Sequence, residues 1–174
     1  AYELWGLDQA SMRMSLDYGF SEGFSFGIAR STFQKTYEGS LKMKLIRQKT
    51  SGGSPVTITA YSAIFLNSLK WLEEDRDNLF SSRLSYVYQC MVARKFNQKF
   101  SFQLTPSFVH RNLVATESMK NDFMALGFGG RFKLSKRVSI NAEYYYQFDR
   151  GPEYFINSLS MGFDIETGGH VFQL

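Results

Sequence analysis

The segment Ser11–Phe20 alternates between apolar and polar residues almost without interruption. One parity is entirely apolar: Met12, Met14, Leu16, Tyr18 and Phe20. The other parity holds serine, arginine, aspartate and glycine. Because successive side chains of a strand point to opposite faces, this pattern predicts a strand with one apolar face and one polar face.

The same period of two returns along the chain and predicts about ten strands. The least regular of them is Val56–Asn67, where Tyr61 and Phe65 fall on the polar side. We therefore predict an all-β fold, a transmembrane antiparallel up-and-down β-barrel in a single domain, residues 1–174. The predicted strands are Ser11–Phe20, Phe24–Ser31, Ser40–Arg47, Val56–Asn67, Ser82–Phe96, Phe100–Arg111, Phe123–Lys133, Val138–Phe148, Asn157–Glu166 and His170–Leu174.

The predicted connections alternate in length, with short turns at one end of the sheet and longer polar loops at the other. This asymmetry is typical of outer-membrane barrels. The exception is Gln48–Pro55, which is long where a short turn is expected. The short turns are Ser21–Gly23, Asn97–Lys99, Ser135–Arg137 and Thr167–Gly169, and the loops are Thr32–Gly39, Ser68–Phe80, Asn112–Asp122 and Asp149–Glu153.

Three features favour lipid, rather than a protein core, against the apolar face. The predicted strands are about 9–12 residues long, which suits a tilted membrane-spanning strand, whereas strands of soluble proteins are nearer 5–6 residues. The polar face is rich in small residues, which suits the interior of a barrel. Aromatic residues gather at strand ends, as Phe20 and Phe24 do around one turn. A soluble lipocalin-like barrel with its apolar face inside is the alternative.

Composition agrees with this interpretation. Aromatic residues make up 17 % of the chain and proline occurs only 3 times, as long paired strands require. No run of about 18 apolar residues occurs, so a transmembrane helix is not predicted. The net charge of +4 comes from scattered residues of both signs, which argues against nucleic acid as a partner. Cys90 is the single cysteine and no metal-ligand spacing occurs, so we expect no cofactor.

A membrane barrel must close, because lipid offers no hydrogen-bond partners to an open sheet edge. Single-chain bacterial barrels have even strand numbers. The tenth predicted strand breaks off at Leu174. We therefore expect this chain to be part of a longer barrel of about twelve or more strands.

The run Met161-Gly-Phe-Asp-Ile-Glu-Thr-Gly-Gly-His-Val-Phe-Gln-Leu174 resembles a segment near the end of an outer-membrane β-barrel family of unknown function from Gram-negative bacteria. Gly6-Leu7-Asp8, which leads into the first strand, is similar as well. The resemblance implies the fold and a location in the bacterial outer membrane. That family has no established activity, so the resemblance implies no catalytic or binding residues.

The best functional candidates are charges on the polar face, which a barrel would place in its lumen. They either line a pore and select solutes by charge, or pair across the lumen and hold the barrel rigid. The strand count does not decide between a filled and an open lumen. The candidates are Arg13, Asp17, Lys42, Lys44, Arg83, Arg131, Glu143, Asp164 and Glu166.

We predict no enzyme activity. His110 near Ser107 or Ser82 is the best approach to a hydrolase pair, but no motif supports it. The acidic stretch within Ser68–Phe80 lacks the glycine and the spacing of a calcium loop, which favours a solvated loop.

The leading functional hypothesis is a porin-like outer-membrane channel for small polar solutes. The alternative is a non-transporting structural or docking subunit of a larger outer-membrane complex. The expected partners are outer-membrane lipid and, for the alternative, other outer-membrane proteins.

Overall fold

The computed structural model describes residues 11–71, 77–114, 116–117, 119–148 and 156–173. These residues form ten strands in one sheet, and each strand pairs antiparallel with its neighbours in sequence. The all-β, up-and-down prediction is therefore confirmed. The strands are β1 (Arg13–Ser21), β2 (Phe24–Ser31), β3 (Thr36–Ile46), β4 (Thr57–Asn67), β5 (Leu84–Lys95), β6 (Phe100–Arg111), β7 (Asp122–Lys133), β8 (Val138–Gln147), β9 (Ser158–Glu166) and β10 (Val171–Gln173).

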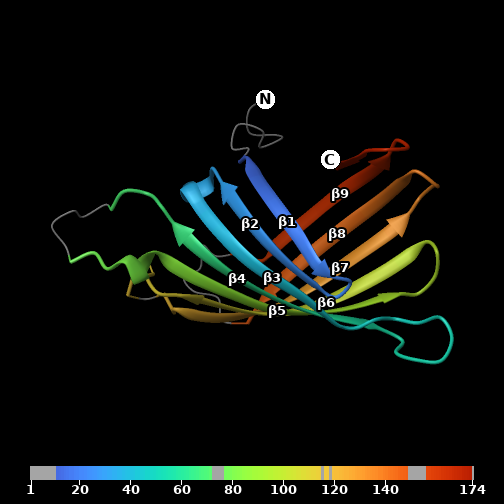
Figure 1. Ribbon diagram of the computed structural model, residues 1–174, viewed down its shortest axis with the longest axis horizontal. Coiled ribbons are helices and arrows are strands. Elements are labelled where there is room, and N and C mark those ends of the chain that lie inside the picture. The colour runs from blue at the N-terminus through green and yellow to red at the C-terminus, as the bar shows by residue number, and fades with distance from the viewer. Residues whose placement is uncertain (1–10, 72–76, 115, 118, 149–155, 174) are drawn as a thin grey trace.

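The sheet curls into a trough, with β1 and β10 as its two edges (Figure 1). The β1–β2, β5–β6, β7–β8 and β9–β10 turns lie at one end of the trough, which we call the turn end. The opposite end, the loop end, carries the connections that follow β2, β4, β6 and β8. The long β3–β4 connection lies at the turn end, as the sequence predicted, and it contains Gly52 and Gly53 at positive φ.

The described residues contain two short 3₁₀ helices, η2 (Phe33–Lys35) and η3 (Phe80–Arg83). They precede β3 and β5 at the loop end. No helix in the described part of the chain is long and apolar enough to cross a membrane.

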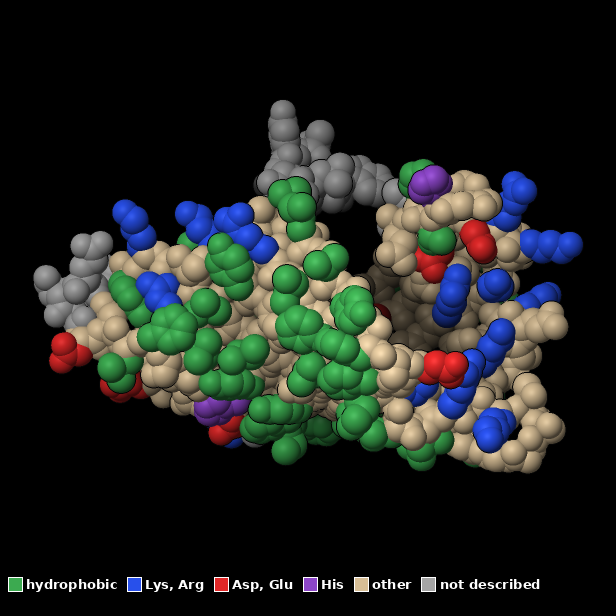
Figure 2. All heavy atoms as spheres, viewed as in Figure 1, with side chains coloured by type: hydrophobic (Ala, Val, Ile, Leu, Met, Phe, Trp, Pro, Cys, Tyr) green, Lys and Arg blue, Asp and Glu red, His purple; other side chains and the backbone are tan. Residues whose placement is uncertain are grey.

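Burial shows which face of the sheet is on the inside of the curve. Thr105 and Ser139 belong to the polar face and are only 3 % and 2 % exposed, because neighbouring strands crowd the concave side. Met14, Phe102 and Tyr144 belong to the apolar face and are 68 %, 37 % and 37 % exposed. Figure 2 shows apolar side chains spread over the outer surface of the trough. The polar face is therefore concave and the apolar face convex, as predicted.

Three predicted strand starts differ from the structure by two residues or more, and the first of them is β1, which begins at Arg13 rather than Ser11. β3 begins at Thr36 rather than Ser40, so the predicted Thr32–Gly39 loop shrinks to the turn around η2. Pairing with β2 and β4 extends the strand through Glu38 and Gly39, two residue types that are depleted in strands. β5 begins at Leu84 rather than Ser82, because Ser82 belongs to η3. The predicted Asp149–Glu153 loop, the acidic residues at 73–75 and the quoted residues 6–8 and 174 lie outside the described residues.

Candidate functional site: the concave face

The concave face carries two small networks of charged residues and, between them, a row of lysines. Strand register assigns twelve charged residues of the described part of the chain to this face. They are Arg13, Asp17, Glu38, Lys42, Lys44, Lys95, Arg111, Arg131, Lys133, Glu143, Asp164 and Glu166. Eight of the nine predicted lumen residues are among them, and Arg83 is not.

The first network joins β1, β3 and β4 near the loop end. Arg13 Nη2 lies 2.8 Å from Glu38 Oε2, and its Nε donates to the same oxygen at 3.2 Å. Tyr61 Oη donates to Glu38 Oε1 at 3.0 Å. The Glu38 side chain is 9 % exposed, so its charge is compensated by the partners that bury it. Tyr61 interrupts the apolar–polar alternation of the predicted strand Val56–Asn67 because its hydroxyl group is a hydrogen-bond partner of Glu38 on the concave face.

Glu38 is a partner that the sequence analysis missed. It has the same parity as Ser40 and Lys42, and this parity was the signal that could have identified it. The predicted strand began at Ser40, which left Glu38 in a loop.

The Arg13–Glu38 pair offers a direct measurement of coupling across the concave face. We expect Arg13→Gln, Glu38→Gln and the double variant to give a coupling free energy of about 0.5–1 kcal/mol, because half of the Arg13 side chain is exposed to solvent. Unfolding of the four proteins by denaturant in lipid vesicles provides the values. Additive effects would show that the pair contributes nothing to stability.

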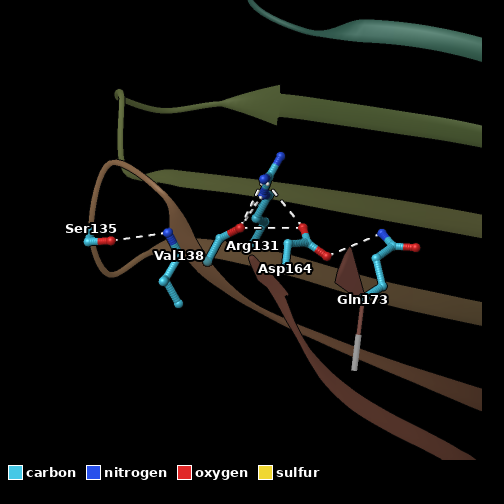
Figure 3. Close-up of polar contacts among 6 residues, drawn as sticks. Arg131, Ser135, Val138, Asp164 and Gln173 are labelled. Carbon is cyan, nitrogen blue, oxygen red and sulfur yellow. Dashed lines mark hydrogen bonds and ion pairs between the residues drawn. The ribbon is translucent and has the colours of Figure 1, made fainter. Parts of the chain in front are cut away.

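The second network joins β7, β8, β9 and β10 near the turn end (Figure 3). Arg131 Nη2 lies 3.3 Å from Asp164 Oδ2, and Arg131 also donates to Ser139 Oγ at 2.9 and 3.0 Å. Ser139 Oγ donates to Asp164 Oδ2 at 3.4 Å, and Gln173 Nε2 donates to Asp164 Oδ1 at 3.2 Å. Asp164 lies on β9 and thus links β7 and β8 on one side to the short last strand, β10, on the other.

The turn before β8 fixes the position of this network. Ser135 Oγ accepts a hydrogen bond from the Val138 backbone N–H at 3.0 Å, and the backbone N–H of Leu134 donates to Val138 O at 2.9 Å. The turn therefore sets the register at which Ser139 enters the sheet opposite Asp164. Figure 3 shows the Ser135–Val138 contact beside the Arg131–Asp164 pair.

A hollow of about 480 Å³ opens on the concave face of β5–β10, next to the second network. Small residues such as Gly129 and Gly162 form its floor, since they leave space where a larger side chain would fill it. Its polar lining combines amides with charges of both signs, namely Gln103, Arg131, Asn141, Glu143, Asp164 and Gln173. Such a surface offers both donors and acceptors to a small polar solute.

Asp17 lies over a glycine of the neighbouring strand. A Cβ built on Gly27 would lie 2.5 Å from Asp17 Oδ1 and 2.8 Å from Ser40 Oγ. Only a glycine therefore leaves room for these two polar groups on either side of β2. Of the other predicted charges, Lys42 and Lys44 lie on β3, Glu143 on β8 and Glu166 at the end of β9.

Arg83 differs from the other candidates, because it lies in η3 and not on a strand. Its Nη1 donates to the backbone carbonyls of Asn67 and Leu69, and its guanidinium stacks 4.1 Å above the ring of Trp71. These contacts fasten the described part of the β4–β5 loop to the start of β5. Their observed role is to hold the loop.

The possible hydrolase pair does not form. His110 Nδ1 lies 2.5 Å from Asp122 Oδ1 on the convex side, whereas Ser107 lies on the concave face and donates to Thr105 O. Ser82 belongs to η3. The described residues also contain no group of three or more histidine, cysteine or acidic side chains that could hold a metal ion.

Comparison with known proteins identifies one relationship. A family model described as a membrane bound beta barrel domain (DUF5777) matches residues 1–174. No curated protein and no solved structure matches the chain.

Proposed function

The chain belongs to this family of membrane bound β-barrel domains, and from that premise we propose that it is a channel of the bacterial outer membrane for small polar solutes. The observation that carries the proposal is the contrast between the two faces of the sheet. The convex face is apolar and exposed, while the concave face holds a hollow lined in part by amide and charged side chains.

The ends of the convex face support a membrane orientation. At the turn end, Phe20 lies 5.7 Å from Phe24 and Phe96 lies 5.6 Å from Phe100, measured between ring centroids. At the loop end, Tyr146 and Phe148 make an edge-to-face contact at 5.4 Å. Aromatic side chains concentrate at the two interfaces of a bilayer, so these groups would mark its two boundaries.

Outward-facing arginines support the same boundaries. Arg94 lies 5.0 Å above the Phe96 ring at the turn end, and Arg30 lies 5.6 Å above the Tyr37 ring at the loop end. A long cationic side chain at a strand end can lay its stem along apolar surface and keep its charge at the interface. Both pairs lie beyond the apolar centre of their strands.

The proposal is tested by conductance in planar bilayers, with two adjacent glycines as matched positions. We expect the protein to conduct, and Gly129→Trp to reduce single-channel conductance roughly twofold, because Gly129 is on the concave face and lines the hollow. Gly130→Trp places the same ring on the convex face and should leave conductance unchanged. A folded protein that never conducts, or equal effects of both substitutions, would contradict the proposal.

A structural role in a larger envelope complex is the second candidate. It is favoured by a recess of about 560 Å³ on the convex side, where Ala60, Ser62 and Cys90 leave space between larger side chains such as Tyr88 and Phe108. Purification in mild detergent separates the two functions. A stoichiometric protein partner together with absent conductance would support docking over transport.

A further inference from the structure

Among the described residues, four lysines of the concave face form no ion pair with a carboxylate, and all four lie toward the turn end. Lys42 and Lys44 are on β3, Lys95 ends β5 and Lys133 ends β7. Their cross-strand neighbours on this face are neutral, since Lys42 faces Ser25 and Tyr61, Lys44 faces Thr59, Lys95 faces Ser101 and Lys133 faces Ser139. Opposite charges on neighbouring strands would normally stabilise such positions. We call these four residues the lysine row.

Two of the acidic residues near the turn end, Asp164 and Glu22, are directed elsewhere. Asp164 is bound by Arg131, Ser139 and Gln173. Glu22 in the β1–β2 turn lies 3.9 Å from Arg47, and only its backbone carbonyl accepts a hydrogen bond from Lys44 Nζ, at 3.3 Å. The positive charge of the lysine row is therefore not cancelled by these two carboxylates.

The turn half of the concave face has a net charge of +3. Five basic residues, the lysine row and Arg131, face two acidic ones, Asp164 and Glu166. The other five charged residues of this face, Arg13, Asp17, Glu38, Arg111 and Glu143, have a net charge of −1. Figure 2 shows Lys and Arg side chains around the hollow and along the rim at the turn end, with few acidic ones beside them.

The position of Lys95 is fixed by the β3–β4 connection. Gln48 Nε2 donates to Lys95 O, and Gln48 Oε1 accepts from the Lys95 backbone N–H, both at 2.9 Å. On the β4 side of β5 the last paired residue is Ala93, and these two hydrogen bonds bind the strand at Lys95, beyond that pair. It holds one member of the lysine row at the mouth of the trough.

We propose that the lysine row makes the turn-end mouth an anion site, so that the channel prefers small anionic solutes, carrying phosphate or carboxylate groups, over cations. The preference rests on the proposed channel function, while the binding site does not require transport. Rings of lysine and arginine select anions in other pores by the same electrostatic principle. Because aqueous ions screen these charges, the preference must weaken as salt concentration rises.

The test combines selectivity with binding, in bilayers of phosphatidylcholine alone so that no lipid supplies negative charge. We expect a chloride-over-potassium permeability ratio of about 3 at 0.1 M salt, rising to about 10 at 0.01 M. In the variant with all four lysines changed to glutamine, the ratio should fall to about 1. We also expect inorganic pyrophosphate to bind the detergent-solubilised protein and this binding to be lost in the variant.

Control variants separate charge from folding. Changing all four lysines to arginine keeps the charge and should keep the preference, and Lys95→Gln alone should remove part of it. Lys35→Gln with Lys70→Gln removes the same kind of charge at the loop end and should leave the ratio unchanged.

The possible outcomes test the anion site and the channel function separately. Conductance without anion preference and without pyrophosphate binding overturns the anion site and leaves the channel function standing. Lysine-dependent pyrophosphate binding without conductance supports the anion site and overturns the channel function. Absence of both overturns both.

Discussion

Replacing Phe128 with arginine is expected to destabilise the folded protein in a bilayer by about 2–4 kcal/mol. Phe128 lies near the middle of β7, on the convex face, between Leu104 of β6 and Tyr144 of β8. Lipid cannot solvate a guanidinium at that depth, and the side chain is too far from either interface to reach water easily. The free energy of unfolding in phosphatidylcholine vesicles, obtained from denaturant titration, measures the effect.

Gln103→Arg is the matched control. Gln103 lies one strand away, on the concave face, and its cross-strand partner is Gly129, the residue after Phe128. There the new charge would face the hollow, close to Glu143. We expect a loss of about 1 kcal/mol or less, from the hydrogen bond that Gln103 Nε2 donates to Thr105 Oγ1. A larger cost for Gln103→Arg than for Phe128→Arg would show that the polar face does not line water.

The face assignment was predictable because it depends on parity alone. A period of two needs no knowledge of neighbouring strands, so Met14 and Arg13 were assigned to the correct faces from a single segment. Most strand bounds also followed, since glycine and polar turn residues interrupt the alternation. β3 departs furthest from its predicted bounds, because its first residues become a strand through pairing with β2 and β4.

The contacts within the concave face were not predictable in the same way. Arg13 is paired with Ser31, while Glu38 is paired with Ala29, so the ion pair runs diagonally across β2. That geometry depends on two registers, which no single segment specifies. Arg83 shows the same limit, because its parity suited the lumen while its guanidinium binds loop carbonyls and Trp71.

Substitution of Gly127 by valine is expected to cost about 1–3 kcal/mol of stability. Gly127 is directly opposite Tyr145 on the concave face, and a Cβ at Gly127 would lie 2.6 Å from Cε1 of the tyrosine ring. The ring covers the glycine backbone, so any side chain there must displace it. Valine has a higher strand propensity than glycine, so the backbone preference alone would make the variant more stable. A loss of stability therefore reports the clash with the tyrosine ring.

Gly129→Val provides the comparison on the same strand and the same face. A Cβ at Gly129 would meet its nearest atom, Gln103 Cβ, at 3.8 Å, which is ordinary contact. We expect this variant to be neutral or slightly stabilised in the same vesicle unfolding assay. In a Tyr145→Ala background the cost of Gly127→Val should disappear, because the displaced ring is then absent. If the cost persists without the ring, the glycine is required for the bend of β7 itself and not for the tyrosine that covers it.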